Sequence, residues 1–242
     1  MHFESVMQIF TVGHSNHSTE QFVSLLKRHG VTAVADVRSF PFSRRFPNFN
    51  QSPLKNSLGS EEISYVFLGE QLGARPRDPE CYMEGKARYE LIAETEAFAT
   101  GLERIYKGAK HHQIALMCAE QDPITCHRAI LVCKHLKNAG LDIKHILKTG
   151  DLEPHEHLEQ RLLKLHNLSE TLPLLETPTA IFKSEAQLEL FNTDTFDTSA
   201  SDKTATSCNL EDLIEQAYQL QGEQIAYVER HKTTDAAHER AS

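Results

Sequence analysis

The first 150 residues alternate short apolar runs with longer stretches of helical periodicity. The short runs are rich in β-branched residues, which is typical of buried strands. They span residues 6–12, 31–37, 63–68, 113–117 and 143–147, and helical patterns cover residues 18–29, 89–106 and 125–138. Strands that alternate with helices form parallel sheets, because each crossover helix covers one face of the sheet. The alternation predicts a three-layer α/β fold with an open, mostly parallel sheet and helices on both faces.

The character of the chain changes after residue 150. A helical pattern covers residues 154–166, and residues 210–228 are amphipathic. Between them, residues 192–207 hold Ser, Thr, Asp or Asn at 12 of 16 positions, which is typical of a flexible linker. We therefore expect an α/β domain (1–150), a helical extension (151–191), a flexible linker (192–208) and a C-terminal amphipathic helix with a tail (209–242).

The net charge of −9 is unevenly distributed along the chain. Residues 1–150 carry 18 Lys and Arg against 16 Asp and Glu, whereas residues 151–242 carry 7 against 18. This split indicates a folded body with a partly disordered, acidic C-terminal extension. Because an acidic segment repels nucleic acid, any contact with nucleic acid is expected within the first 150 residues.

Three features favour a cytoplasmic location. No apolar run approaches the roughly 20 residues that a membrane span needs, so we expect no membrane association. The N-terminus lacks the basic start and the small-residue cleavage site of a signal peptide. Five cysteines, an odd number at low density, are more typical of a reducing compartment than of a disulfide framework.

Reactive side chains follow three of the predicted strands. His14 and Ser15 follow the first strand, Arg38 follows the second, and Cys118 and Glu120 follow the fourth. Ligands of open parallel sheets bind at the carboxyl ends of the strands, near the point where the strand order reverses. The sequence therefore predicts a functional site at this edge of the sheet.

Three separated blocks of residues, in this order along the chain, resemble a known family. The blocks are residues 11–15 (Thr-Val-Gly-His-Ser), residues 36–50 (beginning Asp-Val-Arg-Ser) and residues 118–128 (beginning Cys-Ala-Glu and ending Cys-His-Arg). Together they resemble the bacterial family known as domain of unknown function 488, over about residues 6–150. The resemblance implies a cytoplasmic α/β domain and assigns no activity.

The candidate catalytic groups at this edge are a carboxylate, an imidazole and a thiol. Glu120 is suited to act as a general acid or base, together with His14, whose imidazole titrates near neutrality. Cys118 is suited to act as a nucleophile, because neighbouring arginines and a helix N-terminus stabilise a thiolate.

The candidate phosphate-binding groups are Arg38 and Arg128, whose two guanidinium groups are expected to clamp an anion by bidentate hydrogen bonds. Ser15 and His127 are expected to lie beside them, the latter at a predicted helix N-terminus, which favours an anion. The alternative is that Asp36 pairs with one of the two arginines and only ties the strand ends together.

The two cysteines near this edge have alternative roles. Cys118 ends an apolar run, so it is also suited to be a small buried hydrophobic residue. Cys118, Cys126 and His127 offer a set of metal ligands. On a helix, however, the adjacent side chains of Cys126 and His127 point in different directions, which argues against a metal.

Residues 38–55 combine basic residues with phenylalanines and contain no acid. Basic groups neutralise phosphates and aromatic rings stack on unpaired bases, so this segment has the composition of a surface for single-stranded nucleic acid. The expected contacts are Arg44, Arg45, Phe46, Phe49 and Lys55. The alternative is that the phenylalanines enter the core while the basic groups stay in solvent.

The C-terminal region contains the pentapeptide Gln187-Leu188-Glu189-Leu190-Phe191. It is similar to the segment by which bacterial replication and repair proteins bind the DNA polymerase sliding clamp. Leu190 and Phe191, with Leu188, would fill an apolar pocket, and Gln187 would form hydrogen bonds at its rim. The alternative is a short amphipathic helix that packs on the protein's own domain.

These observations leave three hypotheses about function. The first is an enzyme of DNA repair or replication that hydrolyses or transfers groups on nucleic acid or nucleotides and is recruited by the sliding clamp. The second is a non-catalytic adaptor for DNA and the clamp, and the third is a thiol- or metal-dependent enzyme for small molecules. The enzyme of the first hypothesis requires His14, Glu120 and Arg128 to converge on one accessible pocket. We predict no cofactor and leave a divalent metal open.

Overall fold

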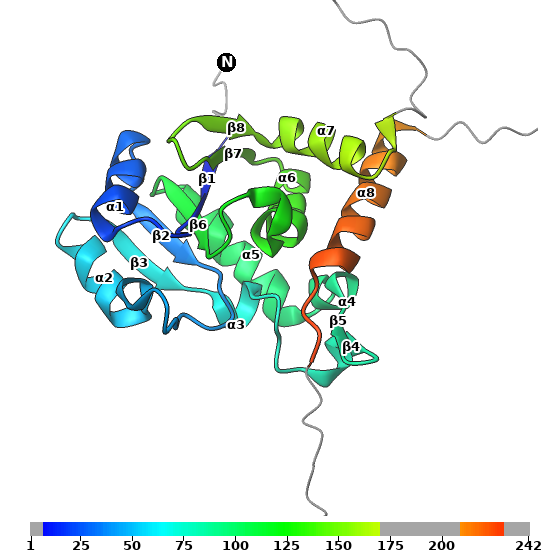
Figure 1. Cartoon of the computed structure of the whole chain (residues 1–242), viewed down its shortest axis with the longest axis horizontal. Coiled ribbons are helices and arrows are strands. Elements are labelled where there is room, and N and C mark those ends of the chain that lie inside the picture. The colour runs from blue at the N-terminus through cyan, green and yellow to red at the C-terminus, as the bar shows by residue number, and fades with distance from the viewer. Residues whose placement is uncertain (1–6, 170–208, 230–242) are drawn as a thin grey trace, which may run out of the picture.

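A six-stranded sheet forms the centre of the molecule (Figure 1). The computed structural model describes residues 7–169 and 209–229. In spatial order the strands are β3 (Ser64–Phe67), β2 (Ala33–Asp36), β6 (Ile114–Cys118), β1 (Gln8–Gly13), β7 (Asp142–Ile146) and β8 (Leu152–Pro154). The pairs between β3 and β7 are all parallel, and β8 pairs antiparallel with β7. The predicted α/β fold with a mostly parallel sheet is confirmed.

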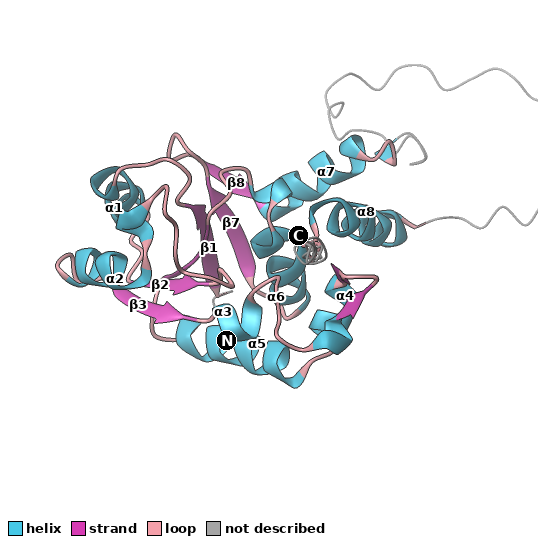
Figure 2. Ribbon diagram, turned by 60° about the horizontal axis from the view of Figure 1, so that its bottom comes forward, coloured by secondary structure: helices cyan, strands magenta, loops and turns pink. Residues whose placement is uncertain are grey.

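Helices cover both faces of the sheet, so the molecule has three layers (Figure 2). Because side chains alternate along a strand, Ile9 and Phe10 of β1 belong to two separate cores. The core around Phe10 is covered by α1 (Thr19–Arg28) and α2 (Gln51–Gly59). The core around Ile9 is covered by α3 (Gly69–Leu72), α4 (Tyr89–Ala93), α5 (Glu96–Ala109), α6 (Lys134–Asn138), α7 (His155–Leu165) and α8 (Leu210–Ile225).

The helix boundaries follow local capping chemistry where the sequence provides it. Ser18 and Gln21 form a capping box at the start of α1, in which each side chain accepts from the other residue's backbone N–H. The single helix predicted over residues 89–106 is wrong in its length, because the chain breaks between α4 and α5. Thr95 accepts a hydrogen bond from the Phe98 N–H and so begins a second helix.

The helix predicted over residues 125–138 is also wrong at its start. A 3₁₀ turn spans Pro123–Thr125, and Asp122 caps it by accepting a hydrogen bond from the Ile124 N–H. Cys126 then has extended backbone angles (φ −132°, ψ 136°). A π-helical turn, Arg128–Cys133, follows and leads into α6. Such turns occur often near functional sites.

The sequence pattern did not predict several short elements. These are α2, α3, the 3₁₀ turns Pro47–Phe49 and Pro79–Cys81, the two-stranded ribbon of β4 (Tyr82–Met83) and β5 (Lys86–Ala87), and β8. These elements are shorter than an average helix or strand, so the apolar residues within them do not repeat often enough to show a period.

The C-terminal helix packs on the domain. α8 contacts α7 and contributes Leu213, Ala217 and Tyr218 to the core around Ile9. The chain after α8 pairs with the ribbon of β4 and β5, where the Ala87 N–H donates to the Tyr227 carbonyl at 2.8 Å. The sheet and this core thus continue beyond residue 150.

Two predicted segments, the linker over residues 192–208 and the clamp-like pentapeptide at residues 187–191, lie outside the described residues. Within the described ranges, no helix combines the length and the apolar composition needed to cross a membrane.

Candidate functional site

The candidate site lies at the carboxyl ends of β2 and β6, because its residues are Arg38 in the loop after β2, Cys118 at the end of β6, and Glu120, Cys126 and His127 after β6. The expected position, the point between β1 and β6 where the strand order reverses, is one strand away from it. His14, the first residue after β1, is hydrogen-bonded to the end of β6, because its N–H donates to the Cys118 carbonyl at 2.9 Å. A Cβ atom at Gly13 would lie 1.9 Å from the Glu120 carbonyl oxygen. Only glycine permits this close approach.

Three metal-ligating atoms converge at this end of β6. The Sγ atoms of Cys118 and Cys126 and a ring nitrogen of His127 all lie within 4.8 Å of one another, and all three residues are buried. The Nδ1 atom of His127 is 3.8 Å from Cys118 Sγ and 3.9 Å from Cys126 Sγ. We call these residues the thiol–histidine cluster.

The extended backbone at Cys126 explains why adjacent side chains can converge. The sequence argument against a metal assumed that Cys126 and His127 both lie on a helix, where their side chains diverge. In the structure Cys126 precedes the helical residues and His127 takes the first helical backbone angles. The prediction that the side chains of Cys126 and His127 point in different directions, which argued against a metal, is therefore wrong.

The orientation of the His127 ring is fixed by a hydrogen bond on the side of the ring that faces away from the two sulfurs. Its Nε2 atom lies 3.0 Å from the Val37 carbonyl oxygen, which can only accept a hydrogen bond, so Nε2 carries a proton. In the neutral ring, Nδ1 then presents a lone pair to the two sulfurs. Metal-ligating histidines commonly donate their second N–H to a carbonyl in this way.

The distances match those of a small tetrahedral metal site. With metal–sulfur and metal–nitrogen bonds of zinc length, tetrahedral geometry separates sulfur and nitrogen by about 3.6 Å. The two sulfur–nitrogen distances of the thiol–histidine cluster exceed this value by only a few tenths of an ångström. Small side-chain movements therefore suffice to close the cluster around an ion.

Glu120 adds a carboxylate to the cluster. Its Oε2 atom lies 3.1 Å from Cys118 Sγ and 3.0 Å from Cys126 Sγ, within hydrogen-bond distance of both sulfurs. Burial and the nearby Cys126 raise the pKa of this carboxyl group. A tetrahedral metal ion held by the three residues of the cluster would have a fourth coordination position. The Glu120 carboxylate lies close enough to contact a water or substrate atom bound there.

The two thiols have opposite electrostatic environments. A hydrogen bond with Cys126, together with burial, raises the pKa of Cys118 well above its usual range. Burial also opposes ionisation of Cys126, but the hydrogen bond from Cys118 and the charge of Arg128 outweigh it and lower the pKa of Cys126. The hydrogen bond and charge of Cys126 in turn outweigh burial at His127 and raise the pKa of its ring.

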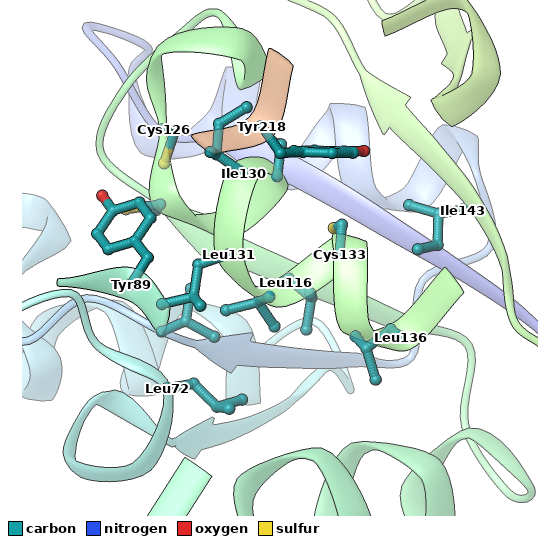
Figure 3. Packing of buried hydrophobic residues seen from close by; sticks show 14 of the residues in the cluster. Leu72, Tyr89, Leu116, Cys126, Ile130, Leu131, Cys133, Leu136, Ile143 and Tyr218 are labelled. Atoms are coloured by element: carbon teal, nitrogen blue, oxygen red, sulfur yellow. The ribbon is translucent and has the colours of Figure 1, made fainter. Parts of the chain in front are cut away.

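The cluster forms the floor of an open cavity of about 290 Å³, the site cavity. Its walls come from the loop after β2, the loop after α3, α4 and the segment after α8; they include Arg38, Phe40, Phe42, Arg75, Tyr89 and Tyr227. Figure 3 shows Cys126 and Tyr89 at the same end of the core. Burial raises the pKa of Tyr89, whose hydroxyl group has no hydrogen-bond partner among the described residues. This hydroxyl therefore stays protonated and free to donate.

The two arginines predicted to clamp a phosphate have internal partners. Arg38 forms a bidentate pair with Asp36, at 2.6 and 2.9 Å, which is the alternative considered above. Arg128 is completely buried and donates to the backbone carbonyls of Glu120 and Gln121, at 2.7 and 3.2 Å. Only Arg38 of the two lines the site cavity. A phosphate would have to compete with these partners.

His14 lies behind the site cavity, outside its lining. Its ring stacks on Phe49 with the centroids 4.4 Å apart, and its Nε2 atom faces Arg38 at 3.4 Å. Burial and the charge of Arg38 lower the pKa of His14 to about 4. Ser15 is half-buried beside it, 3.4 Å from Gln121. The convergence that the first hypothesis required is absent from the described residues, because only Glu120 of its three residues lines this cavity.

The residues predicted to contact nucleic acid separate into two groups. Arg44, Arg45 and Lys55 are exposed, and Phe46 is half-buried. Phe49 is 1% exposed and belongs to the core, as the alternative proposed. The exposed rings of this segment are Phe40 and Phe42, at 65% and 67% exposure, and both line the site cavity.

The predicted clamp-binding residues Gln187, Leu188, Leu190 and Phe191 are outside the described residues. Tyr89, Arg75 and Tyr227 were not predicted as site residues, because they come from segments distant in the sequence and carry no local motif.

Comparison with known families agrees with the resemblance of the three sequence blocks. Residues 18–134 match the family model described as "Domain of unknown function DUF488". This segment contains β2, β6, the thiol–histidine cluster and most of the walls of the site cavity. No curated protein and no solved structure matches the chain. The match supports this domain family for the segment and assigns no activity to it.

Proposed function

We propose that the protein is a metal-dependent hydrolase whose thiol–histidine cluster holds a zinc-like divalent ion. The observation that carries the proposal is that two sulfurs and one ring nitrogen lie within 4.8 Å of one another in residues that line an open cavity. Catalytic zinc sites use three protein ligands and leave the fourth position to water, whereas structural sites are closed by four. Thiolate and imidazole ligands favour zinc over magnesium or calcium.

The surrounding residues supply the other parts of a hydrolytic site. A divalent ion held by Cys118, Cys126 and His127 would supply one function, the activation of a water molecule for attack on the substrate. Glu120 is positioned to accept the proton of that water and to return it to the leaving group. The Tyr89 hydroxyl is positioned to donate to the oxygen that becomes negative in the transition state. Zinc deaminases combine the same types of ligand with a glutamate that is not a ligand, an analogy of chemistry and not of fold.

A buried cation next to the cluster favours its charged form. A metal-bound cluster contains two thiolates, whose charge is cancelled by one divalent ion. The negative charge of the adjacent Glu120 carboxylate must then be balanced by another cation. Arg128 is completely buried beside the cluster. Its guanidinium group, which has no carboxylate partner within ion-pair distance among the described residues, stabilises the thiolates and the Glu120 carboxylate together.

The test is metal analysis of the full chain, purified with a reducing agent and without chelator. We expect about one equivalent of zinc, or uptake of one Co²⁺ by the metal-free protein with a sulfur-to-cobalt charge-transfer band. Cys126→Ser should abolish both signals, and Cys81→Ser, a buried cysteine outside the cluster, should retain them. Glu120→Gln should retain the metal and lose hydrolytic activity. Absence of stoichiometric metal binding by the wild-type protein would refute the proposal.

A second candidate is covalent catalysis by a Cys126 thiolate, which the lowered pKa of this thiol favours. In this case the metal-free protein would react with iodoacetamide at Cys126 much faster than at Cys81. Zinc would inhibit the enzyme instead of activating it. The two candidates therefore predict opposite effects of metal addition on activity.

We also propose that the hydrolase acts on DNA in repair or replication and is recruited by the bacterial sliding clamp. The pentapeptide at residues 187–191 supports this recruitment. Micromolar binding of the full chain to the clamp, abolished by Leu190→Ala with Phe191→Ala, would support it. If the protein binds the clamp and DNA but neither metal nor substrate turnover is found, the protein is the adaptor of the second hypothesis.

A further inference from the structure

A second cavity adjoins the site cavity and shares part of its wall. It has a volume of about 470 Å³, and we call it the side cavity. Ser39, Phe40 and Arg75 line both cavities. The site cavity alone is just below the size range of ligand pockets, whereas the two cavities together fall well within that range. The substrate is therefore expected to span this shared wall.

We propose that single-stranded nucleic acid binds across the two cavities. One unpaired base would occupy the side cavity, its phosphate would lie at Arg75, and the neighbouring nucleotide would reach the thiol–histidine cluster. This inference rests on the proposed hydrolase, because it names the substrate class of that site.

Exposed aromatic rings mark the shared wall. Phe40 and Phe42 are among the most exposed large apolar side chains of the described residues, at 65% and 67%. Large apolar side chains exposed together usually serve a partner. Phenylalanine rings stack on unpaired bases of any sequence, because every base offers a π face. The position of Phe40 between the cavities suits it to stack on a base that enters either one.

Arg75 offers a guanidinium group for the phosphate. This group lies 4.3 Å from the centroid of the Tyr227 ring, and the backbone N–H of Arg75 donates to Ser39 Oγ at 3.0 Å. Among the described residues no carboxylate lies within ion-pair distance of Arg75. Its charge is therefore oriented by an aromatic ring but not neutralised, unlike the charge of Arg38. Arginine in such a setting binds phosphate oxygens by two parallel hydrogen bonds.

The side cavity has the character of a base-binding pocket. Phe67 gives it an aromatic surface, and Gln51 and Gln71 line it with amide groups. A glutamine amide both donates and accepts, which matches the mixed pattern on the edge of a base. A base can enter such a cavity only when it is neither paired nor stacked in a helix. This requirement favours single strands over duplexes.

The basic loop extends the binding surface beyond the cavities. Arg44 and Arg45 are exposed on the loop that also carries Phe40 and Phe42. Among the described residues neither arginine has a carboxylate partner. Further phosphates of the same strand would lie along this loop, which gives the sequence-predicted basic residues a role in an extended site.

The experiment is fluorescence anisotropy with a labelled 12-nucleotide single-stranded DNA of mixed sequence and the matching duplex. We expect the single strand to bind more tightly than the duplex. Phe40→Ala should weaken binding about 5- to 150-fold, the range that corresponds to one stacked base. Arg75→Gln should weaken binding and reduce the slope of log K against log salt by about one. The matched controls are Leu165→Ala and Arg104→Gln, two exposed residues outside both cavities, which should bind as the wild type does.

Three results would overturn the inference: equal affinity of the wild type and Phe40→Ala, preference for the duplex, or competition by free nucleoside monophosphates as strong as by the unlabelled strand. The last result would indicate a free nucleotide as the substrate. Repeating the titration after metal removal separates the two proposals, because strand binding at Arg75 and Phe40 does not require the ion. Strand binding without any metal site would refute the hydrolase alone, whereas metal binding without strand binding would refute this inference alone.

Discussion

Arg128 lies near two buried groups of titratable side chains, and these groups use their polar atoms differently. The first is the thiol–histidine cluster. The second is a histidine relay formed by Thr11, His145, His155, Tyr218 and Glu159. In the relay, each hydrogen-bonding atom is paired with the next residue along a single chain of hydrogen bonds.

The relay is a chain of hydrogen bonds with one direction. Burial lowers the pKa of both histidines, to about 3 for His155, so each ring is neutral with one donor and one acceptor. Tyr218 donates to Glu159 at 3.2 Å and therefore accepts from His155 Nε2 at 2.8 Å. His155 Nδ1 then accepts from His145 Nε2 at 3.0 Å, and His145 Nδ1 accepts from the Thr11 hydroxyl at 2.8 Å.

The contrast shows which buried polar groups indicate a ligand. In the relay, the Nδ1 lone pair of each ring already accepts a hydrogen bond, from Thr11 at His145 and from His145 at His155. In the thiol–histidine cluster, the His127 Nδ1 lone pair and two sulfurs face the same point beside an open cavity. Burial and altered pKa values occur in both groups, so neither property alone identifies the site. The convergence of lone pairs on one accessible point does.

The largest expected difference concerns metal affinity. His127→Gln should lower the affinity for Zn²⁺ more than about 100-fold, because it removes a direct ligand. His155→Gln should leave this affinity unchanged and lower the free energy of unfolding by about 2 kcal/mol, since it leaves buried partners unsatisfied. Competition with a chromophoric chelator measures the first quantity and urea denaturation the second. If His127→Gln and His155→Gln lowered the affinity for Zn²⁺ equally, the proposed difference between the thiol–histidine cluster and the relay would be refuted.

The second prediction concerns acid. Unfolded histidine binds a proton near pH 6.5, whereas His155 in the folded protein does so only near pH 3, so the unfolded state binds more protons between these values. Stability should therefore fall as the pH drops below 6.5, by about 2 kcal/mol at pH 5 from this residue. The charged or titratable groups that face it are His145, Lys137 near α7, Glu159 and Tyr218. Urea denaturation at several pH values measures the effect, and His155→Gln should have a shallower pH dependence than the wild type.

The third prediction isolates the link to α8. Tyr218→Phe removes the acceptor of the His155 N–H and the donor to Glu159, which should cost about 1.5 kcal/mol of unfolding free energy. Metal affinity should not change. Tyr106→Phe, an exposed tyrosine on α5, is the matched control and should stay within about 0.5 kcal/mol of the wild type. A Tyr218→Phe protein as stable as this control would show that the relay contributes nothing to stability.

Much of the fold was predictable because its signals are local. The capping box of Ser18 and Gln21 and the apolar runs that form the five parallel strands lie within short windows of sequence, and the structure contains them. The strand ends also indicated where Cys118 and Glu120 would meet.

The rest of the site depends on geometry that the pattern did not reveal. The apolar periodicity of residues 125–138 predicted a helix that included Cys126, and this hid the metal-ligand set. The one local signal was Asp122-Pro123, which begins a separate short turn and lets the chain re-extend before His127. Phe49 and Phe40 have similar local contexts, and only the tertiary structure places one in the core and the other at the cavities.

The smallest expected effect comes from Gly222, where α8 touches the wall of the site cavity. A Cβ atom at this position would lie 3.2 Å from the Tyr89 ring, so the ring must move by a few tenths of an ångström. Alanine also favours the helix by up to about 1 kcal/mol, so the net change in unfolding free energy for Gly222→Ala should stay below about 1 kcal/mol. Metal affinity should be unchanged, whereas binding of the single-stranded DNA probe should weaken as Tyr89 shifts. Because α8 carries both Tyr218 and Gly222, an effect on the probe without an effect on the metal would show that this helix shapes the cavity and not the metal-binding floor.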